Sequence, residues 1–205
     1  MESVHAILQL EPTLVIGSVP YKQETVAKLL EQPLSFLAMN PRKLADIEDD
    51  IRLLGSITGR TNAADHLVRR MRSAFASLQK RTRKRKPRAK VYCEAWPNPR
   101  IASPPWVAEL VQIAGGEMVV PAGEKVTDEQ IADAQPDLVV LAWAATGRKA
   151  NPKLTYNVAA WKDVPAIRNR QVHVISDELL NTPGPPLLEG AQALATILQG
   201  INRRP

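Results

Sequence analysis

The sequence predicts an α/β protein with two lobes of parallel sheet, the first of them incomplete, joined by one long helix. Three observations lead to this class. Short apolar runs rich in β-branched residues alternate with segments of helical spacing, a pattern typical of parallel sheets covered by helices. Two stretches, 6–16 and 130–140, align without a gap, which indicates a repeated unit. An unusually long helical pattern runs from 61 to 84.

The first lobe is predicted to contain two strands, each following a helix. The strand "PTLVIGS" at 12–18 is entered by a proline and left through a glycine, and its apolar run is typical of a buried parallel strand. A second strand, "LSFLAM", spans 34–39. Helical spacing is found over 2–10 and over 22–31.

Two consecutive helices are predicted after the second strand. Asn40 is suited to be the N-cap of the first helix, with Pro41 at its first helical position. Thr61 is suited to be the N-cap of the second helix, which continues to about Lys84. This second helix is the long one that would connect the lobes.

The second lobe repeats the alternation of strands and helices. Ser103 can cap a helix that starts at about Pro104, and a glycine pair follows that helix. A proline-rich segment at 181–186 predicts a rigid loop. The predicted strands are 90–95, 136–143 and 171–176, the predicted helices are 104–114, 127–135 and 187–199, and a short helical or irregular segment is predicted at 153–161.

The internal repeat indicates that the first lobe is incomplete. Each copy is a helix, a proline corner and a buried strand, at 6–16 and at 130–140. The second copy is preceded by a strand at 90–95 and a helix at 104–114, whereas nothing corresponding precedes the first copy. We therefore expect an N-terminal truncation, with an opening strand–helix unit of about 40–60 residues missing from the first lobe.

Domain boundaries follow from this organisation. We expect an incomplete N-terminal α/β lobe over 1–56, a long connecting helix over 57–86 and a C-terminal α/β lobe over 87–205. A sheet that lacks its opening unit would expose an edge or an apolar face. Homo-oligomerisation through the first lobe is therefore an expectation as well.

Several protein classes are excluded by composition and by missing motifs. The sequence has no run of 18 apolar residues and no signal peptide at its start, so as written it would stay in the cytoplasm. The single cysteine, Cys93, lies in an apolar strand-like segment and is expected to be a buried, inert thiol. No phosphate-binding loop, nucleophile elbow or zinc-protease motif is present. We therefore expect no enzyme activity.

The net charge of +6 comes from one segment. Residues 80–90, "KRTRKRKPRAK", hold eight basic residues, and the remainder has 19 basic against 21 acidic residues. Eight cations could neutralise nucleic-acid phosphates, but no aromatic residues lie among them for base stacking. A solvated helix end is the favoured interpretation. Attraction to an anionic membrane surface is a third alternative.

Four segments, taken in order, resemble the substrate-binding proteins of ABC importers for vitamin B12 and siderophores. The similarity is strongest to the cobalamin-binding branch of that family, and it extends over essentially the whole chain. The segments are "YCEAWPNPRIASPPWVAELVQIAGGE" (92–117), "QPDLVVLAW" (135–143), "WKDVPAIRNRQVHVIS" (161–176) and "LNTPGPPLLEGAQALA" (180–195).

The resemblance implies a helical-linker binding protein of class III, with two Rossmann-like lobes and the ligand held in the cleft between them. It implies that the protein works outside the cytoplasm, in the periplasm or its equivalent. It also implies a membrane permease as partner, onto which both lobes dock. No catalytic cofactor is implied, because the corrinoid would be the transported ligand.

Five residues are candidates for contacting that ligand. In parallel sheets, ligands bind beyond the carboxyl ends of the strands. Indole rings suit a wide macrocycle with apolar faces, because they cover a large area and keep an N–H donor. The candidates beyond predicted strand ends are Trp96, Trp143, Tyr21, Asn181 and Thr182.

Other conspicuous residues receive different roles. Trp106, in the first turn of a helix, and Trp161 are expected to pack in the core. Glu24 is expected to dock the first lobe onto the permease, by resemblance to the family. For the second lobe the sequence leaves a choice among Glu109, Glu178 and Glu189.

The three histidines, His5, His66 and His173, lie on different predicted elements. With no neighbouring spacing of cysteine or carboxylate they are expected to be structural, and no metal site is predicted.

The function predicted from these observations is capture of a cobalamin-like corrinoid and its delivery to a permease. Binding of an iron siderophore is the alternative within the family, and it would require a basic cleft. A nucleic-acid-binding module that uses 80–90 is a second alternative, and a small-molecule α/β enzyme is a third. Nucleic acid is the less expected partner because the cations are confined to one segment and no aromatic residues lie among them to stack on bases.

Overall fold

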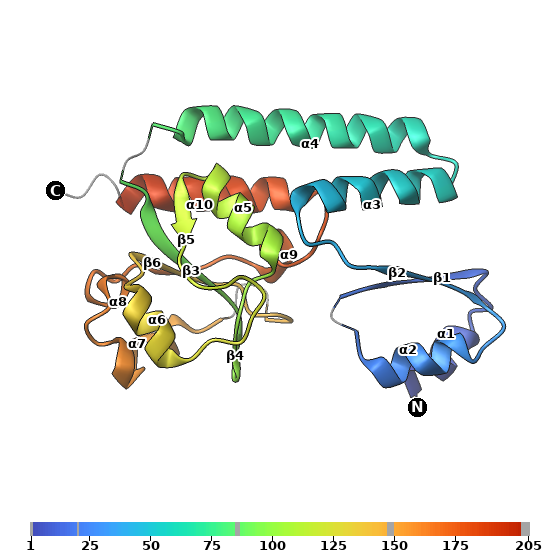
Figure 1. The fold of residues 1–205 in the computed structure, drawn as a ribbon, viewed down its shortest axis with the longest axis horizontal. Coiled ribbons are helices and arrows are strands. Elements are labelled where there is room, and N and C mark those ends of the chain that lie inside the picture. Colours follow the sequence, from blue (N-terminus) through green and yellow to red (C-terminus); the bar gives the residue numbers. More distant parts are fainter. Residues whose placement is uncertain (1, 20, 85–86, 147–149, 202–205) are drawn as a thin grey trace. The chain divides into compact units, whose positions relative to one another are not determined.

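The computed structural model describes residues 2–19, 21–84, 87–146 and 150–201. The chain forms two compact units, Met1–Pro41 and Arg42–Pro205. Each has its own sheet with mostly parallel strands, and Figure 1 shows the helices and strands of each. The predicted α/β class with parallel sheets is confirmed.

The first unit is a two-stranded parallel sheet with two helices. Strand β1 (Leu14–Ser18) pairs with β2 (Ser35–Met39) in parallel register, with Leu14 opposite Ser35. Helix α1 (Glu2–Leu8) precedes β1, and α2 (Gln23–Leu30) connects the strands. All four elements lie where the hydrophobic pattern predicts them, but β1 is not the buried strand that was predicted: none of its residues is buried, and Ile16 is 45% exposed.

The second unit contains a larger sheet. Strands β3 (Ala89–Pro97), β6 (Leu138–Leu141) and β7 (Val172–Val174) are parallel neighbours in the order β3-β6-β7. Two short strands that the sequence analysis missed also pair with β3: β4 (Arg100–Ala102), which is antiparallel, and β5 (Gly116–Met118), which is parallel. Both depend on their pairing with β3, which the local sequence pattern does not reveal.

Alternate residues of the central strands enter two separate cores, one on each face of the sheet. Val91 and Cys93 join the core beneath α3, α4, α5 and α10, whereas Tyr92 joins the core on the opposite face. The same alternation in β6 sends Val140 to the first core and Val139 to the second. Because successive side chains of a strand point to opposite faces, both faces of this sheet are covered.

Helices α3 (Leu44–Ile57) and α4 (Thr61–Thr82) belong to the second unit. Ile47 of α3 and Met71 of α4 are buried in the same core as the sheet. The observed division at Pro41 and Arg42 therefore differs from the predicted boundary at 56–57, because the apolar stripe of α3 packs with the second unit. The role of 57–86 as the connection between lobes stays a prediction.

Three predicted helix starts are corrected by the structure. Helix α3 begins at Leu44 rather than at Pro41, because the Asp46 carboxylate accepts the N–H groups of Arg42 and Lys43 at 2.7 and 2.9 Å and so fixes the first turn. Thr61 is the first residue of α4 and not its cap.

The third correction concerns α5 (Pro105–Ile113), whose N-cap position is Pro104 rather than Ser103. The backbone of Ser103 is held by the carbonyl of Cys93 at 2.8 Å, and its hydroxyl has no partner in the described part of the chain.

The remaining helices complete the second unit. Helix α6 starts after Thr127, whose side chain accepts the N–H of Gln130 in a capping box. Helices α8 and α9 are single turns that the sequence analysis did not separate from their surroundings. The bounds are α6 Asp128–Ala134, α7 Pro152–Tyr156, 3-10 helix η2 Ala159–Trp161, α8 Pro165–Arg168, α9 Asp177–Leu180 and α10 Leu187–Ile201.

Candidate functional site

The carboxyl ends of β3, β6 and β7 form one edge of the larger sheet. Segments that leave these strands are tied together there: the N–H of Ala144 donates to the carbonyl of Ala95 at 3.1 Å. The side chain of Asn181 donates to the carbonyl of Ala142 at 2.6 Å. Three of the predicted ligand contacts, Trp96, Trp143 and Asn181, are therefore brought to one place.

Trp96 is the exposed member of this group. It lies at the end of β3, where the chain turns back into β4, and 43% of its surface is exposed. Its indole N–H donates to the carbonyl of Asn98 at 2.9 Å, which fixes the ring on the hairpin. Trp106 and Trp161 are buried as predicted, and Trp106 donates to the carbonyl of Leu180 at 2.8 Å.

Trp143 faces inward. Only 6% of its surface is exposed, and its indole N–H donates to Glu94 Oε1 at 2.8 Å. Its donor is therefore already used within the protein, and a ligand at this edge would meet at most the rim of the ring.

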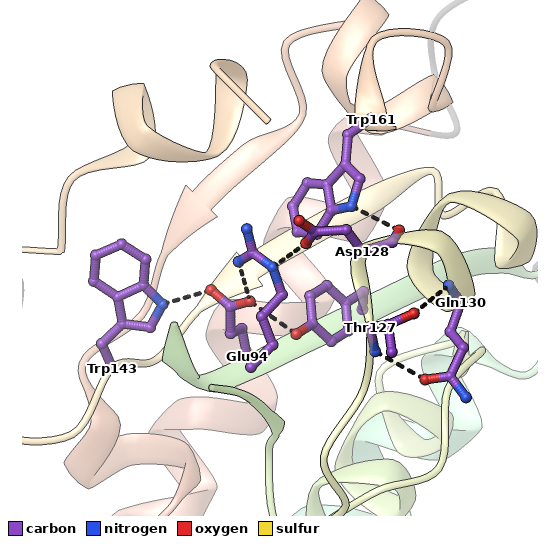
Figure 2. A network of polar contacts seen from close by, with 8 residues as sticks. Glu94, Thr127, Asp128, Gln130, Trp143 and Trp161 are labelled. Atoms are coloured by element: carbon purple, nitrogen blue, oxygen red, sulfur yellow. Dashed lines mark hydrogen bonds and ion pairs between the residues drawn. The ribbon is translucent and has the colours of Figure 1, made fainter. Parts of the chain in front are cut away.

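Glu94 is the centre of a buried polar network that the sequence analysis missed (Figure 2). The side chain has no exposed surface. Its Oε2 accepts the Tyr92 hydroxyl at 2.8 Å and Arg100 Nη1 at 2.7 Å. A charged residue inside a buried strand must find partners, and this was the signal available in the sequence.

Arg100 continues the network across the sheet edge. It forms a second ion pair with Asp128, and its guanidinium lies over the ring of Trp161, 4.4 Å from the centroid. The indole N–H of Trp161 donates to the carbonyl of Asp128 at 3.0 Å. Arg100 thereby links the β3–β4 hairpin to the start of α6.

The electrostatics of the network follow from burial and pairing. Burial is the largest cause of the raised pKa of Tyr92, and the Glu94 carboxylate raises this pKa further. Burial by itself lowers the pKa of Arg100, but Glu94 and Asp128 outweigh it and the net direction is upward. Every described charge in the network is paired. The arrangement therefore has no free nucleophile or base, and it serves to hold the hairpin and Trp143 in position.

Asn181 and Thr182 differ in accessibility. The Asn181 side-chain oxygen is buried and has no partner within the described residues, while its amide nitrogen holds the loop after β6. Thr182 is exposed. The neighbouring Asp177 accepts the N–H of Ala145 at 3.2 Å and so closes the same edge.

The two candidate residues of the first unit lie on either side of the start of α2. The Tyr21 hydroxyl lies 2.6 Å from the carbonyl of Gly17 and 2.7 Å from that of Met39, so it ties the loop after β1 to the end of β2. The Tyr21 ring lines a hollow of about 380 Å³ together with Phe36. Glu24 is exposed in the first turn of α2.

No metal site is formed by the described residues, since no three of their His, Cys, Asp and Glu side chains gather in one place. Cys93 is fully buried, as predicted, and burial raises the pKa of its thiol to about 12. Over the described parts of the chain, none of the helices is both long and apolar enough to cross a bilayer.

Comparisons with known proteins identify what this chain is similar to. The family model "Periplasmic binding protein" matches residues 2–179. A Bacillus subtilis (strain 168) protein described as an uncharacterized ABC transporter substrate-binding lipoprotein, YvrC, is 23% identical over 205 residues. That match covers 94% of this chain and 64% of the relative, so the chain spans less than two thirds of the relative's length.

Solved structures share the fold. The periplasmic heme-binding protein RhuT from Roseiflexus sp. RS-1 superposes with a TM-score of 0.81 at 21% identity, covering 98% of this chain and 81% of that one. The periplasmic vitamin B12 binding protein BtuF of Vibrio cholerae superposes with a TM-score of 0.73 at 19% identity, covering 98% and 79%. At these identities the likeness shows the fold alone.

Proposed function

This chain belongs to the periplasmic binding protein family, and from that premise we propose that it captures a corrinoid ligand and delivers it to the membrane permease of an ABC importer. The proposed role is binding without chemistry. The relative's description as an ABC transporter substrate-binding lipoprotein supports the transport role and a location outside the cytoplasm.

The observation that carries the ligand class is the exposed indole of Trp96. Folding tends to bury large aromatic rings, and the other three tryptophans of the chain are buried. Trp96 instead stands at the carboxyl edge of the sheet, where ligands of parallel α/β folds bind. Its indole N–H already donates to the carbonyl of Asn98, which fixes the ring, so a ligand would contact the apolar face of the indole.

An apolar face suits a macrocycle better than a small polar ligand. A corrin ring has broad apolar faces and a rim of amides, which matches an indole beside hydroxyl and amide groups. In this proposal Trp96 covers the faces of the corrin ring, Thr182 contacts its amide rim, and Trp143 and Asn181 contribute from their less exposed positions. For the first unit, Tyr21 stays a contact predicted from the sequence.

The alternative ligands demand features that the described part of this edge lacks. A heme, the ligand named for RhuT, would be served by an axial histidine, whereas the histidine of β7, His173, lies within the strand with its ring nitrogen 3.2 Å from the side-chain oxygen of Gln171. An anionic iron siderophore would be served by free cations, but Arg100 is neutralised by Glu94 and Asp128. We keep the siderophore as the second candidate, because hydroxyl and amide groups also suit chelates.

Docking onto a permease is the second part of the proposal. Glu24 is exposed on α2 and stays the proposed contact of the first unit. In the second unit Glu109 accepts the N–H of Leu44 at 3.2 Å, so it already serves the start of α3. Glu178 and Glu189 are exposed and are the better choices there.

Titrating the full chain with cyanocobalamin, hemin and a ferric trihydroxamate in parallel tests the ligand class. Tryptophan fluorescence and calorimetry would both be recorded, because coloured ligands absorb the emitted light. We expect saturable binding of cyanocobalamin with one site per chain. Saturable binding of hemin or of the hydroxamate alone would replace the corrinoid proposal, and binding of none would contradict it.

A further inference from the structure

The charge of this protein is concentrated in one continuous stretch. Residues 66–90 hold eleven of the 27 Lys and Arg of the chain and none of its 21 Asp and Glu. The rest of the chain therefore has 16 basic against 21 acidic residues. The protein is thus polarised into one basic segment and an acidic remainder, and the proposed ligand site uses none of this segment.

Helix α4 displays these cations along the side that faces away from its core. Its buried stripe runs through Ala64, Met71 and Leu78. At 100° per residue, Arg69 and Lys80 lie roughly opposite that stripe, and Arg83 and Lys84 follow in the turn after the helix. Figure 1 shows α4 packed along α3 and α10, on the side of these helices away from the sheet. We define the basic face as the exposed residues Arg69, Arg70, Lys80, Arg81, Arg83 and Lys84; Arg85 and Lys86 lie outside the described residues.

The basic face is not neutralised by the described part of the protein. The acidic residues of this region serve other cations: Glu48 pairs with Arg72, and Asp65 pairs with Arg52. No residue of the basic face forms an ion pair with a described residue, and Arg81 donates to the neutral Gln192 amide at 3.1 Å. Clustered like charges repel one another within a Debye length of about 10 Å at 0.1 M salt. An anionic partner would relieve that repulsion.

A shallow groove adjoins the basic face. It lies between α4 and α10, has a volume of about 240 Å³, and is floored by Phe75, Leu78 and Leu188. Arg81 and Gln192 form its polar wall. A cation beside an apolar floor matches an amphiphile, in which an anionic group is joined to a hydrocarbon chain.

We propose that the basic face of α4 docks onto the anionic lipid headgroups of a membrane surface. A row of cations on one side of a straight helix can meet many charges of a flat surface at once, and each Lys or Arg near such a surface adds to the attraction. Stacking on single-stranded nucleic acid needs exposed aromatic rings, whereas Phe75 of α4 is buried and the basic face has none. The choice of a lipid surface rests on the proposed function, which brings the chain to a membrane.

Vesicle co-sedimentation of the full chain tests the proposal. The probes are vesicles of phosphatidylcholine alone and of phosphatidylcholine mixed with phosphatidylglycerol. We expect binding to the mixed vesicles only, with loss of binding as the Debye length falls to about 3 Å at 1 M salt. The triple variant Lys80→Gln, Arg83→Gln, Lys84→Gln should bind on the order of a hundredfold more weakly, at about fivefold per cation.

A matched control removes the same number of exposed cations elsewhere. Lys153, Lys162 and Arg168 lie at α7, η2 and α8 and are exposed. Their triple change to Gln should keep the binding of the original chain. Circular dichroism of both variants shows whether they are folded. The vesicle experiments contain no corrinoid, so their results do not depend on whether the chain binds one.

Three outcomes would overturn the proposal. Equal binding to neutral vesicles would show that charge is not the cause. An equal loss in the control variant would show that net charge matters and the basic face does not. Absence of vesicle binding, together with tight and salt-sensitive binding of a DNA duplex, would assign the basic face to nucleic acid.

Discussion

Glu94 sets the local geometry of the candidate site because it cannot remain buried without its partners. Both carboxylate oxygens are occupied, Oε1 by Trp143 and Oε2 by Tyr92 and Arg100. Removing a charge from water costs several kcal/mol unless such donors replace the water. The same bonds that stabilise the carboxylate hold the hairpin that carries Trp96.

Replacing Glu94 with Gln should destabilise the protein by about 3 kcal/mol. The amide keeps the shape of the side chain, but its NH₂ group would face a donor, and Arg100 would lose one of its two carboxylates. Urea unfolding followed by circular dichroism measures the change. Glu117→Gln, an exposed change in β5, is the control and should leave the midpoint unchanged; equal midpoints for both variants would contradict the role of the network.

The buried thiol predicts a pH dependence. Burial raises the pKa of Cys93 from 9.0 to about 12, so the folded state holds this proton more tightly than the unfolded state does. Below pH 9.0 the stabilisation that the Cys93 thiol gives the folded state is fully present. Between pH 9.0 and about 12 the free energy of unfolding falls by about 1.4 kcal/mol per pH unit because of this one group.

Urea unfolding between pH 8 and pH 11 therefore separates the contribution of Cys93 to the free energy of unfolding from that of other titrating groups. The free energy of unfolding should begin to fall near pH 9 in the original chain. In Cys93→Ala the fall should begin only near pH 10.0, where Tyr92 ionises in the unfolded state but stays protonated in the folded state because burial raises its pKa. Identical profiles would mean that the thiol is ionised as easily in the folded state as in the unfolded state.

At the scale of elements, the site depends on how closely α9 and α10 approach. Gly190 of α10 faces α9 so closely that an added Cβ would lie 1.9 Å from the carbonyl oxygen of Leu179. That contact leaves no room for a side chain. Gly200, in the same helix, has no atom within 4 Å of the corresponding position.

The pair of changes Gly190→Ala and Gly200→Ala should therefore act in opposite directions. Gly190→Ala forces α10 away from α9 and should cost about 2–3 kcal/mol. Gly200→Ala only improves helix propensity and should stabilise by up to about 1 kcal/mol. Denaturant midpoints measure both; equal effects would contradict the packing of α10 on α9.

Elements with long hydrophobic patterns were predictable, and those defined by long-range pairing were not. The strand at 90–95, the helix at 187–199 and the helix from 61 all correspond to observed elements. The short strands β4 and β5 depend on pairing with β3, which local pattern does not reveal. For the same reason the positions of Trp96 and Trp143 at strand ends could be predicted, whereas the partners of Glu94 could not.

At the scale of the whole molecule, almost the entire buried core belongs to the second unit. Both hydrophobic clusters lie within Arg42–Pro205. Among its described residues, the first unit contributes only Val4, Leu29, Met39 and Pro41 to the buried apolar side chains. A segment of 41 residues is rarely stable without additional constraints.

The fragment Arg42–Pro205 should therefore fold by itself. We expect a cooperative urea transition within about 1 kcal/mol of that of the full chain, since its core is complete without the first unit. Residues 1–41 alone should give the circular dichroism of an unfolded peptide. A fragment 42–205 without a cooperative transition would show that its stability depends on the first unit.

Corrinoid capture at the sheet edge is tested most directly by calorimetric titration of cyanocobalamin into three proteins. These are the original chain, Trp96→Ala and Leu154→Ala, the last a matched removal of an exposed apolar side chain in α7. We predict one site per chain and an affinity about thirtyfold weaker in Trp96→Ala, as for loss of an aromatic contact of about 2 kcal/mol. Leu154→Ala should bind as the original chain does. Equal affinities in all three proteins, or no binding by the original chain, would contradict the account.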